Sequence, residues 1–358
     1  MFTEHDLSSA AGVQAYLLTT PFASTTVTPL SGGNSNFAYR LYLSAPYKGH
    51  STLVLKHARP YVALAASIPL AIERQVRLNC GPFATVPGMH YFDEEAHVII
   101  MDDCGASSLT LKELLLTATP SPAVAREIGL ALGEFLGRLH SWAATDPSLL
   151  DFFDQNAQAK QITAWVTYGR LISTLTTDNL PAVALLSEPV PPEDIDDIRA
   201  IIAERTPEIL TSRETLTMGD FWTGNIMVRL RADGEPALER VTVIDWELAK
   251  PGVAALDVGQ FCAEVHTLQL FTPHAVDAAA ALTDAFLTAY RAHCGAMAPH
   301  MANVAAKHIG AHLVTITPRV AWGTPEETAK VIKVGLTHLM EGCSDRWIRE
   351  RSVLALLM

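Results

Sequence analysis

Two short segments with acidic residues at the ends of apolar runs constrain this chain more than any other feature. The first reads TMGDFWTGNIMV over 217–228, and the second reads VTVIDWELAKPG over 241–252. Asp220 lies in a loop ahead of the strand expected to begin at Asn225, and Asp245 directly follows the apolar run V-T-V-I. Because a short hairpin joins the segments, the pattern predicts that two carboxylates and one amide converge on a small volume.

Phosphoryl transfer needs such a set of groups. One carboxylate orients the attacking hydroxyl and accepts its proton, while a second carboxylate and an amide oxygen hold Mg²⁺, which prefers oxygen ligands. For Asp220 alone, a simple turn is the better interpretation, since Asp is favoured in turns. A structural ion pair is the alternative for Asp245. The spacing D-x-x-x-x-N followed by a strand-end Asp favours catalysis.

The length and charge of the chain limit its architecture and its partners. With 358 residues, the chain is long for a single core and predicts two lobes. The formal net charge is −12, and no Lys/Arg cluster occurs, so a nucleic-acid partner is not expected. The acidity fits a cationic substrate, carboxylates around divalent metal, or an ordinary solvated surface.

The cysteines and the first residues predict a cytoplasmic protein. The five cysteines are widely spaced without a C-x-x-C, so neither a disulfide framework nor a zinc site is expected. The start MFTEHDLSSA lacks the basic and then apolar pattern of a signal peptide. No uncharged apolar run reaches membrane-spanning length. No membrane association and no obligate protein partner is predicted.

The first hundred residues predict a sheet with one inserted helix. Thr3 or Asp6 is expected to cap a first helix that ends near Thr19. A second helix, which contains Glu73, is expected over 68–79. Runs of β-branched, aromatic and leucine residues predict strands over 25–30, 37–43, 52–57, 85–92 and 97–101.

The rest of the chain is predicted to be mainly helical. Apolar residues recur at helical spacing over 124–142, 194–204, 255–270, 276–293, 300–316 and 325–341. The proline-rich stretch 181–192 predicts a surface connection. The expected fold class is α+β, with an N-terminal lobe over 1–101, a hinge at 102–103 and a helical lobe over 104–358.

The two acidic segments resemble the catalytic elements of the protein-kinase-like superfamily. G-D-F-W-T-G-N and I-D-W-E are similar to its small-molecule branch, which includes aminoglycoside phosphotransferases, choline kinases and methylthioribose kinases. The segments LSGGNSNFAYRLYLSAPYKGH, LVLKHARP, VIDWELAKPGVAALDVGQF and AWGTPEE extend a discontinuous similarity to fungal methylthioribose-kinase-like enzymes over nearly the whole chain. The resemblance implies a two-lobed protein-kinase-like fold that uses ATP and Mg²⁺.

The resemblance also implies roles for individual residues. Asp220 would be the catalytic base, and Asn225 and Asp245 would be the Mg²⁺ ligands. For ATP binding, the resemblance implies that Lys56 holds the phosphates and that Glu73 pairs with this lysine. A turn would cover the phosphates, and it consists of Ser31, Gly32, Gly33, Asn34, Ser35 and Asn36. The implied hinge residues are Met101, Asp102 and Asp103.

Each ATP-binding assignment is weaker when taken alone. A lysine at a strand end is usually just solvated, and Glu73 has Arg77 as a local partner at i+4. Ser-Gly-Gly-Asn is a common hairpin turn. The order of turn, lysine, glutamate, hinge, base and metal pair is what supports these roles together.

Departures from the family pattern disfavour a protein kinase. The chain has no G-x-G-x-x-G, H-R-D or A-P-E, and Asp245-Trp246-Glu247 stands where D-F-G would be. Met218 replaces the histidine that many relatives carry before G-D, which removes one hydrogen bond expected to brace the loop. The supports of the catalytic loop and the role of Glu247 are therefore open.

The acceptor side is predicted from aromatic and acidic residues near the base. Trp222, Glu247 and Trp322 would suit an arylalkylamine by stacking, cation–π contact and ion pairing. Core packing is the alternative for the tryptophans and the better one for Trp246. His308 and His312 are four residues apart and favour helix packing over half a metal site, with His312 retained as a substrate candidate. Asp257 is expected to cap a helix behind the loop.

These observations predict an ATP- and Mg²⁺-dependent kinase for the hydroxyl group of a small molecule. A hydroxytryptamine-type aromatic amine is the favoured acceptor. A methylthioribose kinase, or another kinase for sugars or amino alcohols, is the first alternative. A nucleotide-binding pseudokinase is the alternative of another class, which intact Lys56, Asp220, Asn225 and Asp245 disfavour.

Overall fold

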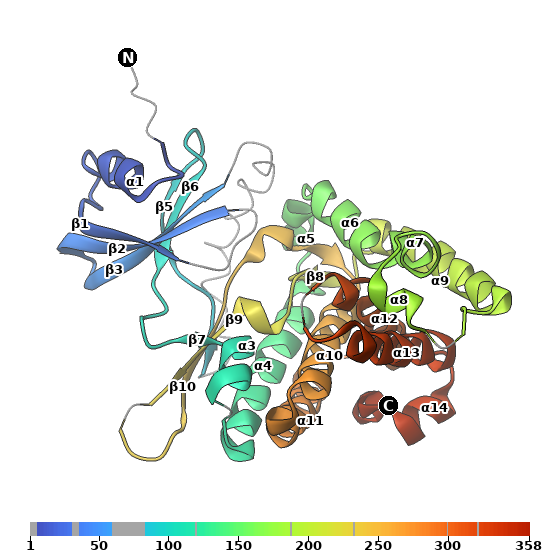
Figure 1. The fold of residues 1–358 in the computed structure, drawn as a ribbon. Helices are drawn as coiled ribbons and strands as arrows, with labels where there is room; N and C mark the ends of the chain where they lie inside the picture. The colour runs from blue at the N-terminus through green and yellow to red at the C-terminus, as the bar shows by residue number, and fades with distance from the viewer. Residues whose placement is uncertain are drawn as a thin grey trace. The chain divides into compact units, whose positions relative to one another are not determined.

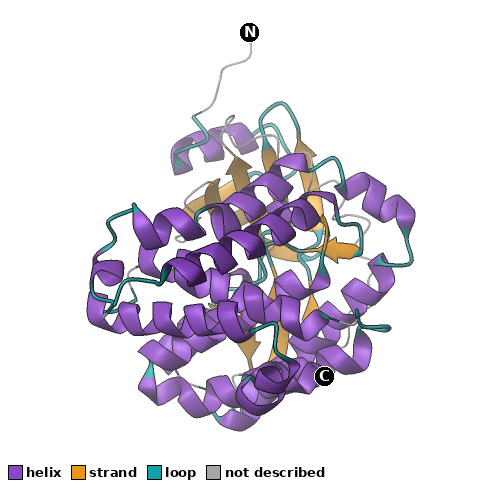
Figure 2. Ribbon diagram, turned by 90° about the vertical axis from the view of Figure 1, so that its right-hand side faces the viewer, coloured by secondary structure: helices purple, strands orange, loops and turns teal. Residues whose placement is uncertain are grey.

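The computed structural model describes residues 6–30, 36–58, 83–118, 120–186, 188–231, 233–298, 300–320 and 322–358. The chain forms two compact units (Figure 1). One consists of Met1–Leu78 and Val86–Ser108, and the other of Asn79–Thr85 and Leu109–Met358. In the described residues, the first unit is mainly sheet and the second is mainly helical, as the colouring of Figure 2 shows. This α+β division confirms the predicted fold class.

The first unit is built on an antiparallel sheet with the strand order β1-β2-β3-β6-β5. Leu53 and Leu55 are fully buried in its core. Because side chains alternate across a strand, Lys56 lies on the opposite face. The strands predicted over 25–30, 37–43, 52–57 and 97–101 are confirmed. The bounds of the sheet's strands are β1 Ser24–Leu30, β2 Asn36–Tyr47, β3 His50–Ala58, β5 Met89–Asp93 and β6 Val98–Asp102. The helix expected over 68–79 lies outside the described residues.

The predicted cap of the first helix is wrong. Helix α1 spans Ala10–Leu17, and Ser9 is its N-cap, with Oγ accepting a hydrogen bond from the Gly12 amide at 3.1 Å. The Asp6 carboxylate instead accepts from the backbone and hydroxyl groups of Ser8. Thr3, the other expected cap, lies outside the described residues. The side chain of Asp6 thus bonds within its own local turn, whereas Ser9 is the residue directly before the helix and caps it.

The strand expected over 85–92 is two strands in different sheets. Strand β4, Ala84–Thr85, pairs in parallel with β10, Leu238–Val243, in the second unit, whereas β5 pairs with β6 in the first. Pro87 has no amide hydrogen for a ladder. The Gly88 amide donates to the Asp102 carboxylate at 2.8 Å. The backbone between the two strands is therefore not available for continuous pairing.

Two small sheets form the inner part of the second unit. One has the order β4-β10-β9-β7, with β9 at Ile226–Leu230 and β7 at Leu109–Thr110. The other pairs β8, Thr215–Thr217, with β11, Lys250–Gly252. The sequence did not predict strand β11 or this pairing. The expected hairpin is β9–β10, and the candidate catalytic loop lies between β8 and β9, ahead of the hairpin.

Helices make up most of the second unit. The long predicted helices are confirmed as α4 Pro122–Ala143, α9 Pro192–Thr211, α10 Ala254–Phe271, α11 Val276–His293, α12 Met301–Thr315 and α13 Pro325–Glu341. Unpredicted shorter helices are α3 Leu111–Glu113, η2 Leu114–Ala118, α5 Pro147–Phe153, α6 Ala157–Thr163, η3 Ala164–Gly169, α7 Leu171–Thr176, α8 Pro181–Ala184 and α14 Asp345–Arg351. No helix in the described part of the chain has both the length and the apolar content that a bilayer span requires.

Helices α4 and α11 pack with their backbones in close contact. Gly129, Gly133 and Gly137 recur every four residues along α4 and face α11. A Cβ atom at Gly133 would lie 2.8 Å from the Tyr290 amide nitrogen and closer still to the Phe286 carbonyl oxygen. The contact therefore depends on the missing side chains of these glycines.

Candidate active site

A tight turn after β8 carries Asp220. Gly219, the residue before it, has φ +78°, a conformation that side chains disfavour. A Cβ atom at Gly219 would also overlap with Lys250 Nζ and the Leu248 carbonyl oxygen. The turn therefore requires glycine, and the backbone directly behind it fixes where Asp220 begins.

Two amides hold the Asp220 carboxylate. Gln260 Nε2 donates to Oδ1 at 2.9 Å, and Asn225 Nδ2 donates to Oδ2 at 2.9 Å. The pKa of Asp220 is raised to about 6, mainly because burial penalises its charge. The Gln260 hydrogen bond opposes this rise, while the negative charge of Asp245 adds to it. Asp220 is thus an oriented carboxylate whose pKa lies near neutral pH.

The structure brings Asn225 and Asp245 to the same place as Asp220. Asn225 ends the 3-10 turn η4, Thr223–Asn225, and its carbonyl oxygen accepts from the Ile244 amide at 2.9 Å. Asp245 is the next residue and has φ +67°, so the chain turns sharply after β10. Two carboxylates and an amide therefore meet where β9 begins and β10 ends. This donor set consists of the oxygen ligands that Mg²⁺ prefers.

Asp257 supports the catalytic loop from α10. Its carboxylate accepts from the backbone amides of Met218 at 2.7 Å and Gly219 at 2.9 Å. It also contacts His140 Nε2 at 3.3 Å. The expectation that Asp257 caps a helix is wrong, because α10 begins at Ala254 and the Asp257 side chain is used by the loop. A backbone amide thus braces the loop at Met218, where the family pattern suggested a histidine side chain.

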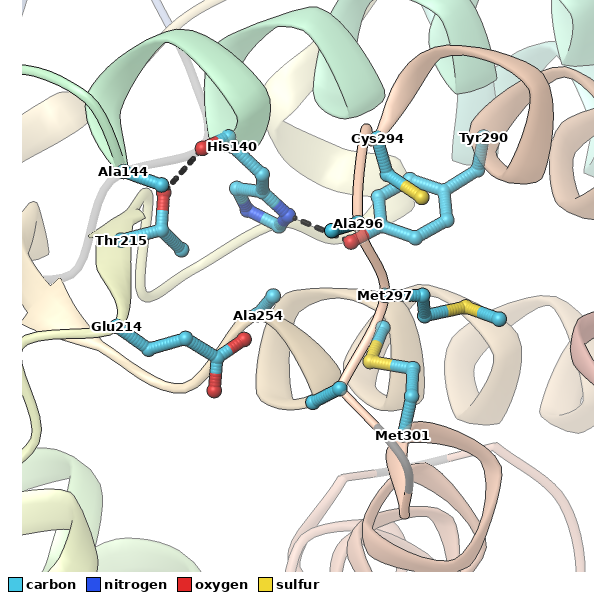
Figure 3. Close-up of a pocket in the computed structure, with 11 residues that line it drawn as sticks. His140, Ala144, Glu214, Thr215, Ala254, Tyr290, Cys294, Ala296, Met297 and Met301 are labelled. Carbon is cyan, nitrogen blue, oxygen red and sulfur yellow. Dashed lines mark hydrogen bonds between the residues drawn. The ribbon is translucent and has the colours of Figure 1, made fainter.

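His140 connects this support to a small cavity of about 50 Å³ (Figure 3). His140 Nδ1 lies 2.9 Å from the Tyr290 hydroxyl, and Thr215 Oγ1 donates to the His140 carbonyl oxygen at 2.7 Å. The cavity is lined by His140, Ala144, Glu214, Thr215, Ala254, Tyr290, Cys294, Ala296, Met297, Ala298 and Met301. The hydrogen bonds drawn in Figure 3 therefore belong to the buried layer that holds the loop, behind the reacting groups.

Lys250 is a buried cation directly under the loop. It is 1% exposed, and its Nζ donates to the Leu248 carbonyl oxygen at 3.2 Å. Burial lowers its pKa to about 8, while the charges of Asp257 and Asp220 counteract that effect. A lysine here places positive charge beneath an otherwise acidic loop.

Two predicted acceptor residues, Trp222 and Trp322, lie on either side of Lys112. The Lys112 ammonium is 4.0 Å from the Trp322 ring centroid and 5.4 Å from that of Trp222. Trp322 also stacks on Phe271, with ring centroids 5.9 Å apart. The structure therefore brings together an aromatic pair that is far apart in the sequence, with a lysine on α3 between its members.

The other acceptor candidates have different environments. His312 contacts the Glu264 carboxylate at 2.7 Å, and both side chains are buried. The Glu247 side chain is half-buried, and its carbonyl oxygen accepts from Asn156 Nδ2 at 3.0 Å. Trp246 is 3% exposed and donates to the Val243 carbonyl oxygen, which supports its interpretation as core packing.

The nucleotide candidates in the first unit are only partly described. Ser31–Ser35 and Glu73 lie outside the described residues, and Asn36 begins β2. Lys56 is in β3, in register with Ile99 of β6. At the end of β6, Met101 and Asp102 are paired in the sheet, and Asp103 forms two hydrogen bonds with Arg40, at 2.7 and 3.0 Å. The carboxylates of the expected hinge thus stabilise the first unit.

Sequence reasoning missed several residues around the base. Gln260 and Glu264 follow Asp257 at three and seven residues along one face of α10, and that spacing was a readable signal. Lys250 and Lys112 gave no such signal, because only tertiary packing places them beside the loop and the tryptophans.

Comparison with known proteins finds one matching family model and several similar kinases. The model of the phosphotransferase enzyme family matches residues 26–300. The chain is 30% identical to 4-hydroxytryptamine kinase of Psilocybe cyanescens, over 95% of this chain and 94% of that protein. It is 28% identical to 4-hydroxytryptamine kinase of Psilocybe cubensis, over 95% of each chain. Methylthioribose kinase of Bacillus pumilus is 25% identical over 74% of this chain and 69% of that protein.

Solved structures show the same fold at low sequence identity. The GDP complex of aminoglycoside 2'-phosphotransferase-IIIa matches with a TM-score of 0.52 and 14% identity, covering 94% of this chain and 99% of that one. An amicoumacin kinase in complex with AMP-PNP, Ca²⁺ and its ligand matches with a TM-score of 0.51 and 11% identity, covering 92% of each chain.

Proposed function

The chain belongs to the phosphotransferase enzyme family, and we propose that it transfers the γ-phosphoryl group of Mg-ATP to the hydroxyl of a hydroxytryptamine-type amine. It is a small-molecule kinase, and the identity of the acceptor is the proposed part. The observation that carries the proposal is the Asp220 carboxylate, held by Gln260 and Asn225 beside Asp245. Similarity over nearly full length to two 4-hydroxytryptamine kinases supports the acceptor class.

In this proposal Asp220 is the catalytic base. Its carboxylate orients the acceptor hydroxyl and takes its proton as the oxygen attacks phosphorus. Gln260 and Asn225 fix the carboxylate rotamer, and Asp257 holds the loop backbone. Positioning of this kind supplies much of the rate enhancement in phosphoryl transfer.

Asn225 and Asp245 would hold Mg²⁺, because they lie where β9 begins and β10 ends and offer the oxygen ligands that suit a hard cation. When bound, the metal ion neutralises charge on the transferred phosphate. The amicoumacin kinase structure contains Ca²⁺ together with a nucleotide analogue, which supports a divalent cation in this fold.

The proposed ATP-binding residues lie outside this loop. Lys56 would hold the phosphates and pair with Glu73, and the turn Ser31–Asn36 would cover the phosphates. Met101–Asp103 would meet adenine through backbone groups, as the hinge between lobes at 1–101 and 104–358. We also place the enzyme in the cytoplasm, since Cys262, Cys294 and Cys343 are free thiols.

Methylthioribose phosphorylation is the second candidate, favoured by the 25% identity to methylthioribose kinase of Bacillus pumilus. ADP release with Mg-ATP should be measured over a panel of hydroxyindole amines, methylthioribose, choline and aminoglycosides. Turnover confined to a hydroxyindole amine supports the proposed acceptor. Turnover confined to a sugar contradicts it and leaves the kinase chemistry standing.

The role of the base is tested by Asp220→Asn. We expect ADP release to fall below detection while the affinity for Mg-AMP-PNP stays within about twofold, because the base contributes mainly to the transition state. Asp277→Asn, which alters an exposed carboxylate in the first turn of α11, is the control and should be unchanged. Normal turnover in Asp220→Asn contradicts the assignment.

A further inference from the structure

Glu264 lies on the face of α10 that also supports the catalytic loop. Asp257, Gln260 and Glu264 occupy successive turns of the helix, and the first two contact the loop and the base. One helical turn advances about 5.4 Å. The negative charge of Glu264 also contributes to the raised pKa of Asp220, as expected for a neighbouring carboxylate. Glu264 is therefore about one turn beyond the group that holds the base.

The Glu264 carboxylate is buried and only half satisfied. The residue is 6% exposed, and its Oε1 accepts from His312 Nε2 at 2.7 Å. Its Oε2 is buried without a hydrogen-bond partner among the described residues. Burying a carboxylate oxygen without a donor is unfavourable, so this oxygen is a candidate for a ligand that brings N–H donors and positive charge.

The tryptophan pair limits where such a cation binds. Lys112 already places an ammonium group against the rings of Trp322 and Trp222. A second cation at the same rings would meet a like charge, which is unfavourable. An acceptor with both an aromatic ring and an ammonium group would therefore direct the ring toward the tryptophans and the ammonium toward an acid.

We propose that Glu264, held in place by its contact with His312, binds the ammonium group of the acceptor and so makes the enzyme select hydroxylated amines over neutral alcohols. The inference rests on the proposed function, since it assumes that Asp220 receives the acceptor hydroxyl. It revises the expectation that cation–π contact with the tryptophans recognises the amine. It also gives His312 a positioning role.

The test compares two acceptors that differ only in charge. One is 4-hydroxytryptamine, and the other is its neutral analogue of the same shape, in which a methyl group replaces the ammonium group. At saturating Mg-ATP we expect the wild type to prefer the amine. Glu264→Gln should lower kcat/KM for the amine about 100-fold, the size typical of a buried charge pair, and change the analogue by less than about threefold. Glu341→Gln, at an exposed carboxylate, is the matched control.

Each other outcome has a defined meaning. An equal loss for both acceptors makes Glu264 a structural residue and overturns the inference, as does an unchanged preference for the amine. If Glu264→Gln does not fold, the wild type is compared on the two acceptors. Equal kcat/KM for both then overturns the inference about Glu264 and leaves the proposed function standing. If the wild type phosphorylates neither acceptor, the proposed function fails. Calorimetry then still tests Glu264, because the amine should bind the wild type and not the variant.

A separate cluster in the first unit has the composition of a metal site. His50 at the start of β3, His90 in β5 and Asp102 at the end of β6 offer three ligand atoms within 4.8 Å of one another. His90 Nε2 lies 2.8 Å and His50 Nε2 3.7 Å from Asp102 Oδ1. Ligand atoms about 2.1 Å from a tetrahedral zinc ion are about 3.4 Å apart, so only small side-chain shifts are needed.

We infer that these three side chains bind a divalent transition-metal ion of the zinc class, with water completing the coordination. The Gly88 amide donates to the other Asp102 oxygen at 2.8 Å and orients this ligand. His50 and Asp102 are partly exposed, so solvent and metal reach them. Mixed imidazole and carboxylate ligands favour zinc over Mg²⁺, which separates this site from the one near Asp220.

The metal inference is tested by binding alone. In excess Mg²⁺, one equivalent of Co²⁺ should bind the full chain and give the visible absorption of a tetrahedral site. His90→Gln and Asp102→Asn should abolish this signal, whereas His300→Gln, at an exposed histidine, should keep it. Equal Co²⁺ binding by the wild type and His90→Gln overturns the inference, as does the absence of stoichiometric binding by the wild type.

Discussion

At the scale of single residues, the candidate site consists of charged and amide side chains packed around the loop that carries Asp220. Asp220 is held by amides, and the loop that carries it is held by Asp257. Lys250 lies beneath Gly219 and partly offsets the negative charge above it. Desolvation dominates the pKa shifts of both Asp220 and Lys250, so the site is set mainly by burial.

Lys250 gives a prediction with a defined pH dependence. Its pKa is about 8 in the folded protein, against about 10.5 for a lysine in water. Between these values the unfolded chain binds more protons, so the contribution of Lys250 to the free energy of unfolding rises with pH. Lys250→Met lacks this contribution. The stability of the wild type relative to Lys250→Met should therefore increase from pH 8 to pH 10 and be constant below pH 8.

Urea unfolding at several pH values measures this difference. Lys330→Met, which removes an exposed lysine from α13, is the control and should follow the wild type at every pH. A constant difference between the wild type and Lys250→Met across pH 8 to 10 contradicts the prediction.

Gln260 gives a kinetic prediction. Gln260→Leu removes the donor to Asp220 Oδ1, so the carboxylate loses one of its two positioning amides. We expect kcat to fall about tenfold or more, with the KM for ATP nearly unchanged, because orientation of the base acts on the chemical step. Gln269→Leu, on the same helix, is the control. Steady-state kinetics with the preferred acceptor measures both variants, and an unchanged kcat in Gln260→Leu contradicts the role.

The sequence predicted part of this site for an identifiable reason. Asp220, Asn225 and Asp245 lie at the ends of two strands joined by a hairpin, so their proximity follows from local chain connectivity. Gln260 and Glu264 share one face of α10 with Asp257, which their spacing indicates, but only the packing of α10 behind the loop brings Gln260 into contact with Asp220. Their roles, like those of the predicted ATP-binding residues, stay predictions.

At the scale of elements, helix α10 carries the side chains that contact Asp220 and its loop. It carries Asp257, Gln260 and Glu264 on one face, and Gly259 lets α12 approach closely, since a Cβ atom there would lie 3.0 Å from the Ala305 carbonyl oxygen. This packing buries His308, whose pKa is lowered to about 3, mainly by desolvation. The long helices were predictable from their apolar spacing. The short helices between 147 and 176 were not, because each spans too few turns for a periodic pattern.

The packing of α4 on α11 gives a stability prediction. Gly133→Ala would place a Cβ atom against the Phe286 carbonyl oxygen and the Tyr290 amide, which are backbone groups that cannot rotate away. We expect a loss of about 1–3 kcal/mol in the free energy of unfolding, despite the better helix propensity of alanine. Leu130→Ala, at an exposed position of the same helix, should change stability much less. Equal or greater stability of Gly133→Ala contradicts the backbone contact.

At the scale of the whole molecule, the net charge is −12, and part of this negative charge lies at the proposed site. The negative charges of Asp245 and Glu264 both raise the pKa of Asp220 within the second unit. Such a cluster attracts cations, and the proposed function uses two of them, Mg²⁺ and the acceptor ammonium. For the remaining acidity, an ordinary solvated surface stays the expectation from the sequence.

The proposed Mg²⁺ site leads to a prediction for the intact protein. A ligand that binds only the folded state stabilises it by about 2.7 kcal/mol at a concentration 100 times its Kd. We therefore expect AMP-PNP with Mg²⁺ to raise Tm by several degrees, and AMP-PNP with EDTA to raise it much less. Asp245→Asn should lose most of the metal-dependent part, because it removes a charged oxygen ligand, whereas Asp277→Asn should behave as the wild type. If EDTA leaves the nucleotide-induced rise in Tm unchanged, the nucleotide binds without the metal, and Asn225 and Asp245 need another role.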